Sequence, residues 1–173
     1  KRISRIEPLI DKLSVCLDAG SSSGEFVYLM RKSGYETQGV EANEPYAVFS
    51  KKNLDIPVSI TPFSKFKPER EFDLISMFHV LEHLENPIRD LRYLADSLRV
   101  GGTMVIEVPN ILYPDMAFSN KWHPAHLFSY TVESLSSLMR EVGLEVLRCD
   151  DVDGGANIWG EFRKVQEMNP STK

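Results

Sequence analysis

Hydrophobic and polar residues alternate along this chain in two rhythms, one typical of strands and one typical of helices. Short apolar runs predict strands at residues 15–17, 35–43, 56–60, 72–78, 103–108, 144–147 and 158–165. Apolar residues at helical spacing predict helices within residues 3–13, 26–34, 45–49, 87–98 and 131–141. Because strands alternate with helices, we expect an α/β fold: a doubly wound, mostly parallel seven-stranded sheet with helices on both faces. A single domain should cover residues 1–173.

Two segments have a predicted place in this fold. The segment 56–60 should form an edge strand, because Pro57 cannot donate a hydrogen bond to a neighbouring strand. The irregular segment from Asn110 to His126 is longer than a typical connection, which indicates a functional lid.

The stretch 15–26 is distinctive because a buried strand runs directly into a turn of small residues. Gly20 and Gly24 permit a positive φ and a close approach of ligand to backbone, and the unpaired amides of the next helix can face a polar group. The turn therefore predicts the floor of a nucleotide-type pocket. A flexible linker and a nucleophile elbow, Gly-x-Ser-x-Gly, remain as alternatives. The dinucleotide fingerprint G-x-G-x-x-G is absent, which disfavours a nicotinamide or flavin enzyme.

An acidic residue follows the second predicted strand. Glu41 lies about 20 residues beyond the glycine turn, the spacing at which a carboxylate reaches ribose hydroxyls. The alternative is an ordinary acid at a strand end. Ligands of parallel sheets bind outside the carboxyl ends of the strands, which would place residues 18–24, 41, 78–83 and 110–126 along one edge.

Charge and composition argue against some classes of partner and indicate the redox compartment. The formal net charge of −5 shows no basic footprint, so we expect no nucleic-acid partner. No run of 18 apolar residues is present, so we expect no membrane partner. Two cysteines make no disulfide framework, which fits a reducing cytoplasm. Since the chain begins with Lys1 and not with methionine, the sequence does not decide whether a targeting segment or a further domain precedes it.

Several segments in order resemble the class I S-adenosylmethionine-dependent methyltransferases, which have a Rossmann-like fold. They are the acid and small-residue turn at 17–24, the ribose-binding acid within 39–41, the fourth strand and its continuation at 72–84, and the turn into the fifth strand at 98–103. Residues 122–143 are similar to a subgroup that acts on small molecules, including sugar and quinone-ring precursors.

The resemblance implies S-adenosylmethionine as cofactor and a small-molecule acceptor. The expected cofactor contacts are Asp18, Ala19, Gly20, Ser21, Ser22, Gly24, Glu41, Ala42, Phe63, Phe78 and His79. The family often places an acid against the adenine after the third strand. Residues 60–63 contain none, so we expect backbone groups or stacking on Phe63 to hold the adenine.

All four histidines fall after the fourth or fifth predicted strand. Histidine titrates near neutrality and suits a base that deprotonates an acceptor, so His126, His83 and His79 are the catalytic candidates. Trp122, His123 and Tyr130 are expected to shape the acceptor pocket. Each of these residues has a structural alternative, as a backbone-bonded histidine or as core packing.

The order His79-x-x-Glu82-His83 also matches an inverted zinc-protease pattern. That pattern requires a helix, whereas His79 directly follows a strand, so proteolysis is disfavoured. We assign no metal ligands. Certain quinone-ring methyltransferases of the resembled family have acid and histidine ligands near this position, so the resemblance keeps a bound divalent ion as an alternative.

We therefore expect an S-adenosylmethionine-dependent methyltransferase. A non-catalytic cofactor-binding module of a larger biosynthetic enzyme and, less favoured, a nicotinamide-dependent oxidoreductase are the alternatives. The sequence does not determine the methylated atom or the oligomeric state.

Overall fold

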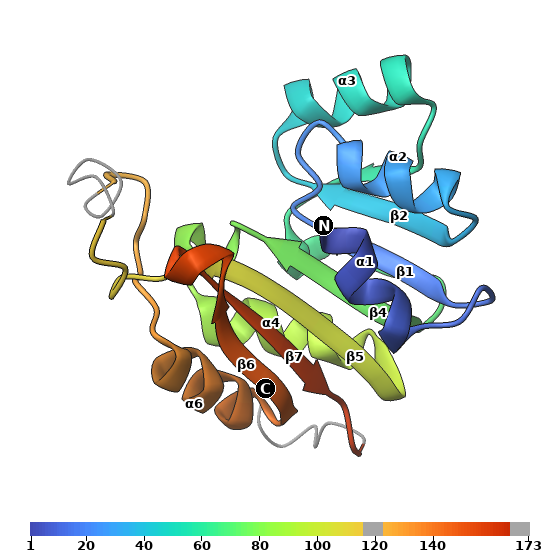
Figure 1. Ribbon diagram of the computed structural model, residues 1–173. Coiled ribbons are helices and arrows are strands. Elements are labelled where there is room, and N and C mark those ends of the chain that lie inside the picture. The colour runs from blue at the N-terminus through green and yellow to red at the C-terminus, as the bar shows by residue number, and fades with distance from the viewer. Residues whose placement is uncertain (116–122, 167–173) are drawn as a thin grey trace.

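The computed structural model describes residues 1–115 and 123–166. These residues form one seven-stranded sheet with the strand order β3-β2-β1-β4-β5-β7-β6 (Figure 1). The strands are β1 (Val15–Ala19), β2 (Glu36–Glu41), β3 (Val58–Ile60), β4 (Phe72–Phe78), β5 (Leu98–Pro109), β6 (Glu145–Val152) and β7 (Asn157–Arg163). Strands β1 to β5 pair in parallel, and β7 is antiparallel to both β5 and β6. The predicted fold class is confirmed, and β3 lies at an edge as Pro57 indicates.

Helices precede and connect the strands, and α3, α4 and α6 begin at residues whose side chains cap the first turn. They are α1 (Arg2–Ile6), α2 (Glu25–Lys32), α3 (Glu44–Leu54), α4 (Pro87–Asp96) and α6 (Val132–Val142), with short 3-10 helices η1 (Glu7–Leu9), η2 (Phe63–Lys65), η3 (Leu81–His83) and η4 (Asp153–Gly155). Asn43 and Asn86 accept hydrogen bonds from the first-turn amides of α3 and α4, and Thr131 forms a capping box with Ser134 of α6.

Two apolar layers hold the helices on opposite faces of the sheet. On one face, Ile6 of α1 and Met30 of α2 pack against Leu74 and Trp159. On the other, Leu91 of α4 and Met139 of α6 join the larger core cluster. All of these side chains have no exposed surface, so the sheet is covered on both faces and its functional groups are confined to its edges.

Three predicted boundaries are wrong. The apolar stripe 3–13 predicted one helix, but α1 and η1 end at Leu9, and Leu13 is 89% exposed. Residue 98 starts β5 instead of ending α4, and the strand continues through Gly101, whose amide donates to the Lys164 carbonyl at 2.7 Å. Likewise β6 runs to Val152 across residues predicted as a turn. Strand pairing outweighs the local signals in the last two cases, because residue 98 pairs with Phe72 of β4 and residues 145–152 pair with β7.

The chain order creates the place for a ligand. Strands β1, β2, β4 and β5 are parallel, so their carboxyl ends at Ala19, Glu41, Phe78 and Pro109 share one edge of the sheet. The chain runs outward in one direction from β1 through β2 to β3 and in the other through β4 to β5, so β1 and β4 flank a topological switch point. Within the described residues, no helix is long and apolar enough to cross a bilayer.

Candidate active site

A cavity of about 510 Å³ opens at the switch point between β1 and β4. Its lining includes seven of the predicted cofactor-binding residues: Gly20, Ser22, Glu41, Ala42, Phe63, Phe78 and His79. The remaining lining is Asn43, Tyr46, Pro62, Ser64, Val80, His83, Leu84, Arg89 and Asp90. Sequence reasoning missed all of this second group except His83, because these residues lie in loops, short 3-10 helices or the first turns of α3 and α4, whose positions depend on the tertiary fold.

The small-residue turn after β1 packs closely against the segment that follows β4, and it borders the cavity. Gly20 has a φ of +79°, and a Cβ atom there would lie 2.4 Å from Cγ2 of Val80. The Glu41 carboxylate accepts the Ser22 amide at 2.8 Å and the Asn43 amide at 2.7 Å. This carboxylate therefore orders the turn from the end of β2 while it lines the cavity. A glycine with no room for a side chain and a carboxylate at the second strand end fit a nucleoside-containing cofactor.

Four of the predicted cofactor residues lie outside the cavity lining. Asp18 is buried and accepts a hydrogen bond from the Ser76 hydroxyl at 2.7 Å. Burial raises the pKa of Asp18 to about 7, against the opposing effect of the Ser76 hydrogen bond. Ala19 is fully buried, and the Ser21 hydroxyl is turned into the protein toward β2. At Gly24, a Cβ atom would lie 2.3 Å from Ile56 Cδ1, so this glycine permits close packing.

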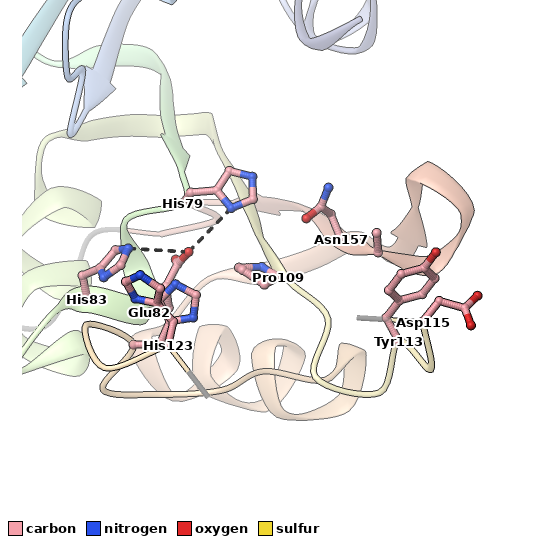
Figure 2. A pocket seen from close by; sticks show the side chains of 10 residues that line it. His79, Glu82, His83, Pro109, Tyr113, Asp115, His123 and Asn157 are labelled. Atoms are coloured by element: carbon pink, nitrogen blue, oxygen red, sulfur yellow. Dashed lines mark ion pairs between the residues drawn. The ribbon is translucent and has the colours of Figure 1, made fainter. Parts of the chain in front are cut away.

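A second cavity, of about 570 Å³, adjoins the first. Its lining is His79, Glu82, His83, Pro109, Tyr113, Asp115, His123, His126, Ala156 and Asn157 (Figure 2). His79 and His83 line both cavities. The structure thus brings all four histidines together, as the sequence predicts, and it adds Glu82, Tyr113, Asp115 and Asn157, which we did not predict. Trp122 lies outside the described residues.

His79 stands at the junction of the two cavities in an uncommon backbone conformation. Its φ is +55°, and its amide donates to the Glu107 carbonyl at 2.8 Å. Its Nε2 atom lies 3.2 Å from Glu107 Oε1, and its Nδ1 atom lies 3.6 Å from Glu82 Oε1. The hydrogen bond with Glu107, followed by the contact with Glu82, raises the pKa of His79 to about 9. A histidine that is charged at neutral pH has no lone pair with which to accept a proton, so its environment favours positioning over general-base catalysis.

The Glu107 carboxylate is anchored from the opposite end of the chain. Arg2 of α1 donates to it at 2.6 Å, and Arg5 lies 3.6 Å away. Burial alone would raise the pKa of Glu107, but the hydrogen bonds from His79 and Arg2 outweigh it and lower that pKa. Residues 2 and 107 are too far apart in sequence for any local pattern to reveal this contact.

Glu82 occupies the centre of the histidine group. It is 1% exposed, and neither of its carboxylate oxygens has a hydrogen-bond partner. Besides His79, it faces His83, whose Nε2 atom lies 3.9 Å from its Oε1 atom. Tyr130 is buried as well, with an unpartnered hydroxyl. Burial and the charge of Glu82 raise the pKa of Tyr130. Tyr130 is not among the residues that line the second cavity, although we expected it to shape the acceptor pocket.

The other histidines come from the segment after residue 122. Nδ1 of His83 lies 2.8 Å from the Ala125 carbonyl, so it donates to that oxygen and leaves Nε2 toward Glu82. The amides of Leu127 and Phe128 donate to the Glu82 carbonyl, which ties this segment to η3. Burial lowers the pKa of His126, so its imidazole is neutral near pH 7 and able to accept a proton.

One group in this site has the composition of a metal site. Glu82, His83 and His126 each offer a ligand atom, and these atoms lie within 4.8 Å of one another. Two imidazoles and one carboxylate suit a first-row divalent ion. The same groups also suit proton transfer, because a neutral histidine lies beside a carboxylate at the wall of a cavity.

The chain matches a known protein family and a group of curated relatives. A family described as a methyltransferase domain matches residues 1–148. The tRNA U34 carboxymethyltransferase of Shewanella loihica is 28% identical over 171 residues, which are 86% of this chain and 50% of that relative. The chain therefore spans about half the length of the curated relatives it matches.

Solved structures agree on the fold. The 1,6-didemethyltoxoflavin-N1-methyltransferase of Burkholderia thailandensis, with S-adenosylhomocysteine bound, matches with a TM-score of 0.73 at 22% identity, over 89% of this chain and 72% of that chain. The methyltransferase in a complex with the Haloferax volcanii Trm112 methyltransferase activator matches with a TM-score of 0.78 at 13% identity, over 91% of this chain and 85% of that chain.

These relatives overturn one expectation. We excluded nucleic acid and expected a small-molecule acceptor, yet the relatives matched over most of this chain are named for tRNA modification. The exclusion was wrong because it used the net charge of −5 for the whole chain. A net charge averages over the entire surface and does not report the field at one site.

Proposed function

From the premise that this chain belongs to the methyltransferase-domain family, we propose that it transfers a methyl group to a nucleotide of RNA held in the histidine-lined cavity. The cofactor is S-adenosylmethionine, whose sulfonium supplies the activated methyl group. The observation that carries the proposal is the junction of two cavities at His79 and His83. A cofactor on the β1–β2 side and an acceptor on the histidine side would meet there.

The chain's own residues divide into two tasks. On the cofactor side, the Ser22 turn and the Glu41 carboxylate bind and orient the nucleoside. On the acceptor side, His126 takes the proton from the acceptor, and Tyr113 and His123 offer rings on which a base can stack. Alignment of the reacting atoms contributes most of the rate enhancement, up to about 7–11 kcal/mol in ideal cases.

An RNA acceptor is supported by the tRNA-modifying relatives and by the size of the cavity. A volume of about 570 Å³ lies within the range of about 300–1,000 Å³ of small-ligand pockets, so one unpaired nucleotide can enter while the rest of the strand stays outside. The acceptor atom would then lie beside the imidazole of His126.

The test is transfer of a labelled methyl group. The protein is incubated with methyl-labelled S-adenosylmethionine and total tRNA, and the RNA is digested to nucleosides to locate the label. We expect label in a nucleoside, with loss in the Gly20→Val variant. Cofactor binding in calorimetry without label in any RNA would refute the RNA acceptor, and failure to transfer to any acceptor would favour a non-catalytic binding module.

A further inference from the structure

Two carboxylates line the cofactor cavity, and they stand on different elements. Glu41 ends β2 and accepts the amides of Ser22 and Asn43. Asp90 comes from the first turn of α4 and is only 7% exposed. A nearly buried acid is costly in a protein interior unless hydrogen-bond donors reach it, so the place of Asp90 in the cavity wall requires a reason.

The hydrogen bonds of Asp90 leave one of its oxygens available. Nε of Arg89 donates to Oδ1 of Asp90 at 2.9 Å. The Arg89 side chain is 59% exposed and that of Asp90 is 10% exposed, so the arginine approaches from the solvent side. Within the described residues, no hydrogen bond is donated to Oδ2. Because an ionised carboxylate has about four lone-pair positions, Asp90 retains the capacity to accept from a ligand.

Asp90 lies toward the β3 side of the cavity. Residues 62–64, which follow β3, line the cavity together with Asp90. Tyr93 is three residues beyond Asp90 and therefore on the same face of α4, and its hydroxyl donates to the Phe66 carbonyl at the end of η2. This face of α4 thus packs against the segment after β3, and β3 lies outside β2 in the sheet.

The shape of the cofactor determines which of its parts meets Asp90. The sulfur that carries the methyl group must lie beside His79, where the two cavities join, and the ribose lies at Glu41. The base and the sulfur are attached on opposite sides of the ribose ring. The base therefore extends away from β4, past the end of β2, toward residues 62–64 and Asp90.

We propose that Asp90 selects the base of the cofactor by accepting an N–H bond from the 6-amino group of adenine on Oδ2. A 6-oxo base such as hypoxanthine has a carbonyl oxygen at this position, which a carboxylate repels. Arg89 holds the carboxylate by Oδ1 and so leaves Oδ2 for the base. The inference rests on the cofactor placement of the proposed function and is independent of the RNA acceptor.

The neighbouring side chains do not provide this selectivity. Residues 60–63 contain no acid, and Arg89 can only donate hydrogen bonds. The hydroxyl of Ser64 both donates and accepts, so it would bind an amino group and a carbonyl alike. Asp90 is the acceptor on this side of the cavity that distinguishes the two bases.

Calorimetry with two ligands tests the inference. S-adenosylhomocysteine carries the 6-amino group, and S-inosylhomocysteine carries a 6-oxo group in its place. The wild type should bind the adenosyl ligand about tenfold or more tightly, as expected for a hydrogen bond to a charged group. In Asp90→Asn the preference should fall to within about threefold, because an amide accepts from adenine and donates to hypoxanthine.

The matched control is Asp150→Asn. Asp150 is paired with Arg148 at 2.7 Å, much as Asp90 is paired with Arg89, but it lies on β6 at the far edge of the sheet. This variant should keep the wild-type preference. If Asp90→Asn does not fold, Asp90→Ala replaces it and should weaken adenosyl binding about tenfold, with inosyl binding changed by less than about threefold.

Four results would overturn the inference. They are a wild type that binds both ligands equally, an Asp90→Asn variant with the wild-type preference, an Asp150→Asn variant that loses the preference as well, and a wild type that binds neither ligand. An unchanged preference with a lower melting temperature would leave Asp90 a stabilising acid in the first turn of α4. A failure to methylate RNA would refute the proposed acceptor without affecting these binding measurements, so the two failures are distinguishable.

Discussion

Replacement of Gly20 by alanine tests the structure of the cofactor cavity at its narrowest point. Gly20 has a φ of +79°, where a non-glycine residue costs about 1–2 kcal/mol. The new Cβ atom would lie 2.4 Å from Cγ2 and 3.1 Å from Cγ1 of Val80, an overlap that typically costs about 1–3 kcal/mol. Gly20→Ala should therefore lower the free energy of unfolding by about 2–5 kcal/mol.

A second substitution separates the two contributions. Val80→Ala removes both overlapping methyl groups but leaves the positive φ unchanged. In the double variant, the loss caused by Gly20→Ala should shrink by about 1–3 kcal/mol, and the remainder should reflect the backbone alone. The free energies come from urea unfolding of the four proteins.

Calorimetry with S-adenosylmethionine supplies the functional readout. Because Val80 lines the cofactor cavity, its displacement should weaken binding by about tenfold or more in Gly20→Ala. The larger Gly20→Val should abolish binding in a folded protein. A Gly20→Ala variant that unfolds and binds like the wild type would refute the assigned backbone conformation, and strictly additive effects would refute the contact with Val80.

Three further outcomes are expected. Glu41→Ala should weaken cofactor binding about tenfold or more in calorimetry. It should also lower the melting temperature, because the Glu41 carboxylate accepts the Ser22 amide. Unchanged affinity would refute the assignment of Glu41 to the ribose hydroxyls. His126→Ala should lower kcat by about a hundredfold with cofactor affinity unchanged, and a normal rate would make His126 structural. Asp18 binds its proton more tightly when folded, because its pKa is raised from 3.8 to about 7. Its contribution to folding is therefore full below about pH 4, and roughly 4 kcal/mol of it is lost as the pH rises from about 4 to about 7. Urea unfolding of Asp18→Asn should lack this decline, and parallel pH curves of the two proteins would contradict it.

The fold and one half of the site could be predicted from the sequence because their signals are local. Buried strands and amphipathic helices have distinct periods, and parallel strands place their carboxyl ends at one edge. Gly20, Glu41 and Phe78 follow β1 or end β2 and β4, so strand prediction alone brings them to the same cavity. The histidines could be placed near them by the same rule.

Local signals did not reveal how the side chains are paired. The sequence marked Asp18 as a cofactor contact, but pairing of β1 with β4 turns its carboxylate to Ser76. It marked Glu82 as part of a disfavoured protease pattern, although folding places this carboxylate among His79, His83 and His126.

What the sequence determined by itself is therefore the order of strands and helices and the edge at which function gathers. Only the tertiary structure decided how the two glutamates beside His79 are paired, since Arg2 meets Glu107 across 105 residues. The physical reason is that periodicity records the burial of each residue relative to its neighbours in the chain. The charge and proton state of a buried group depend on atoms that only folding brings within a few ångströms.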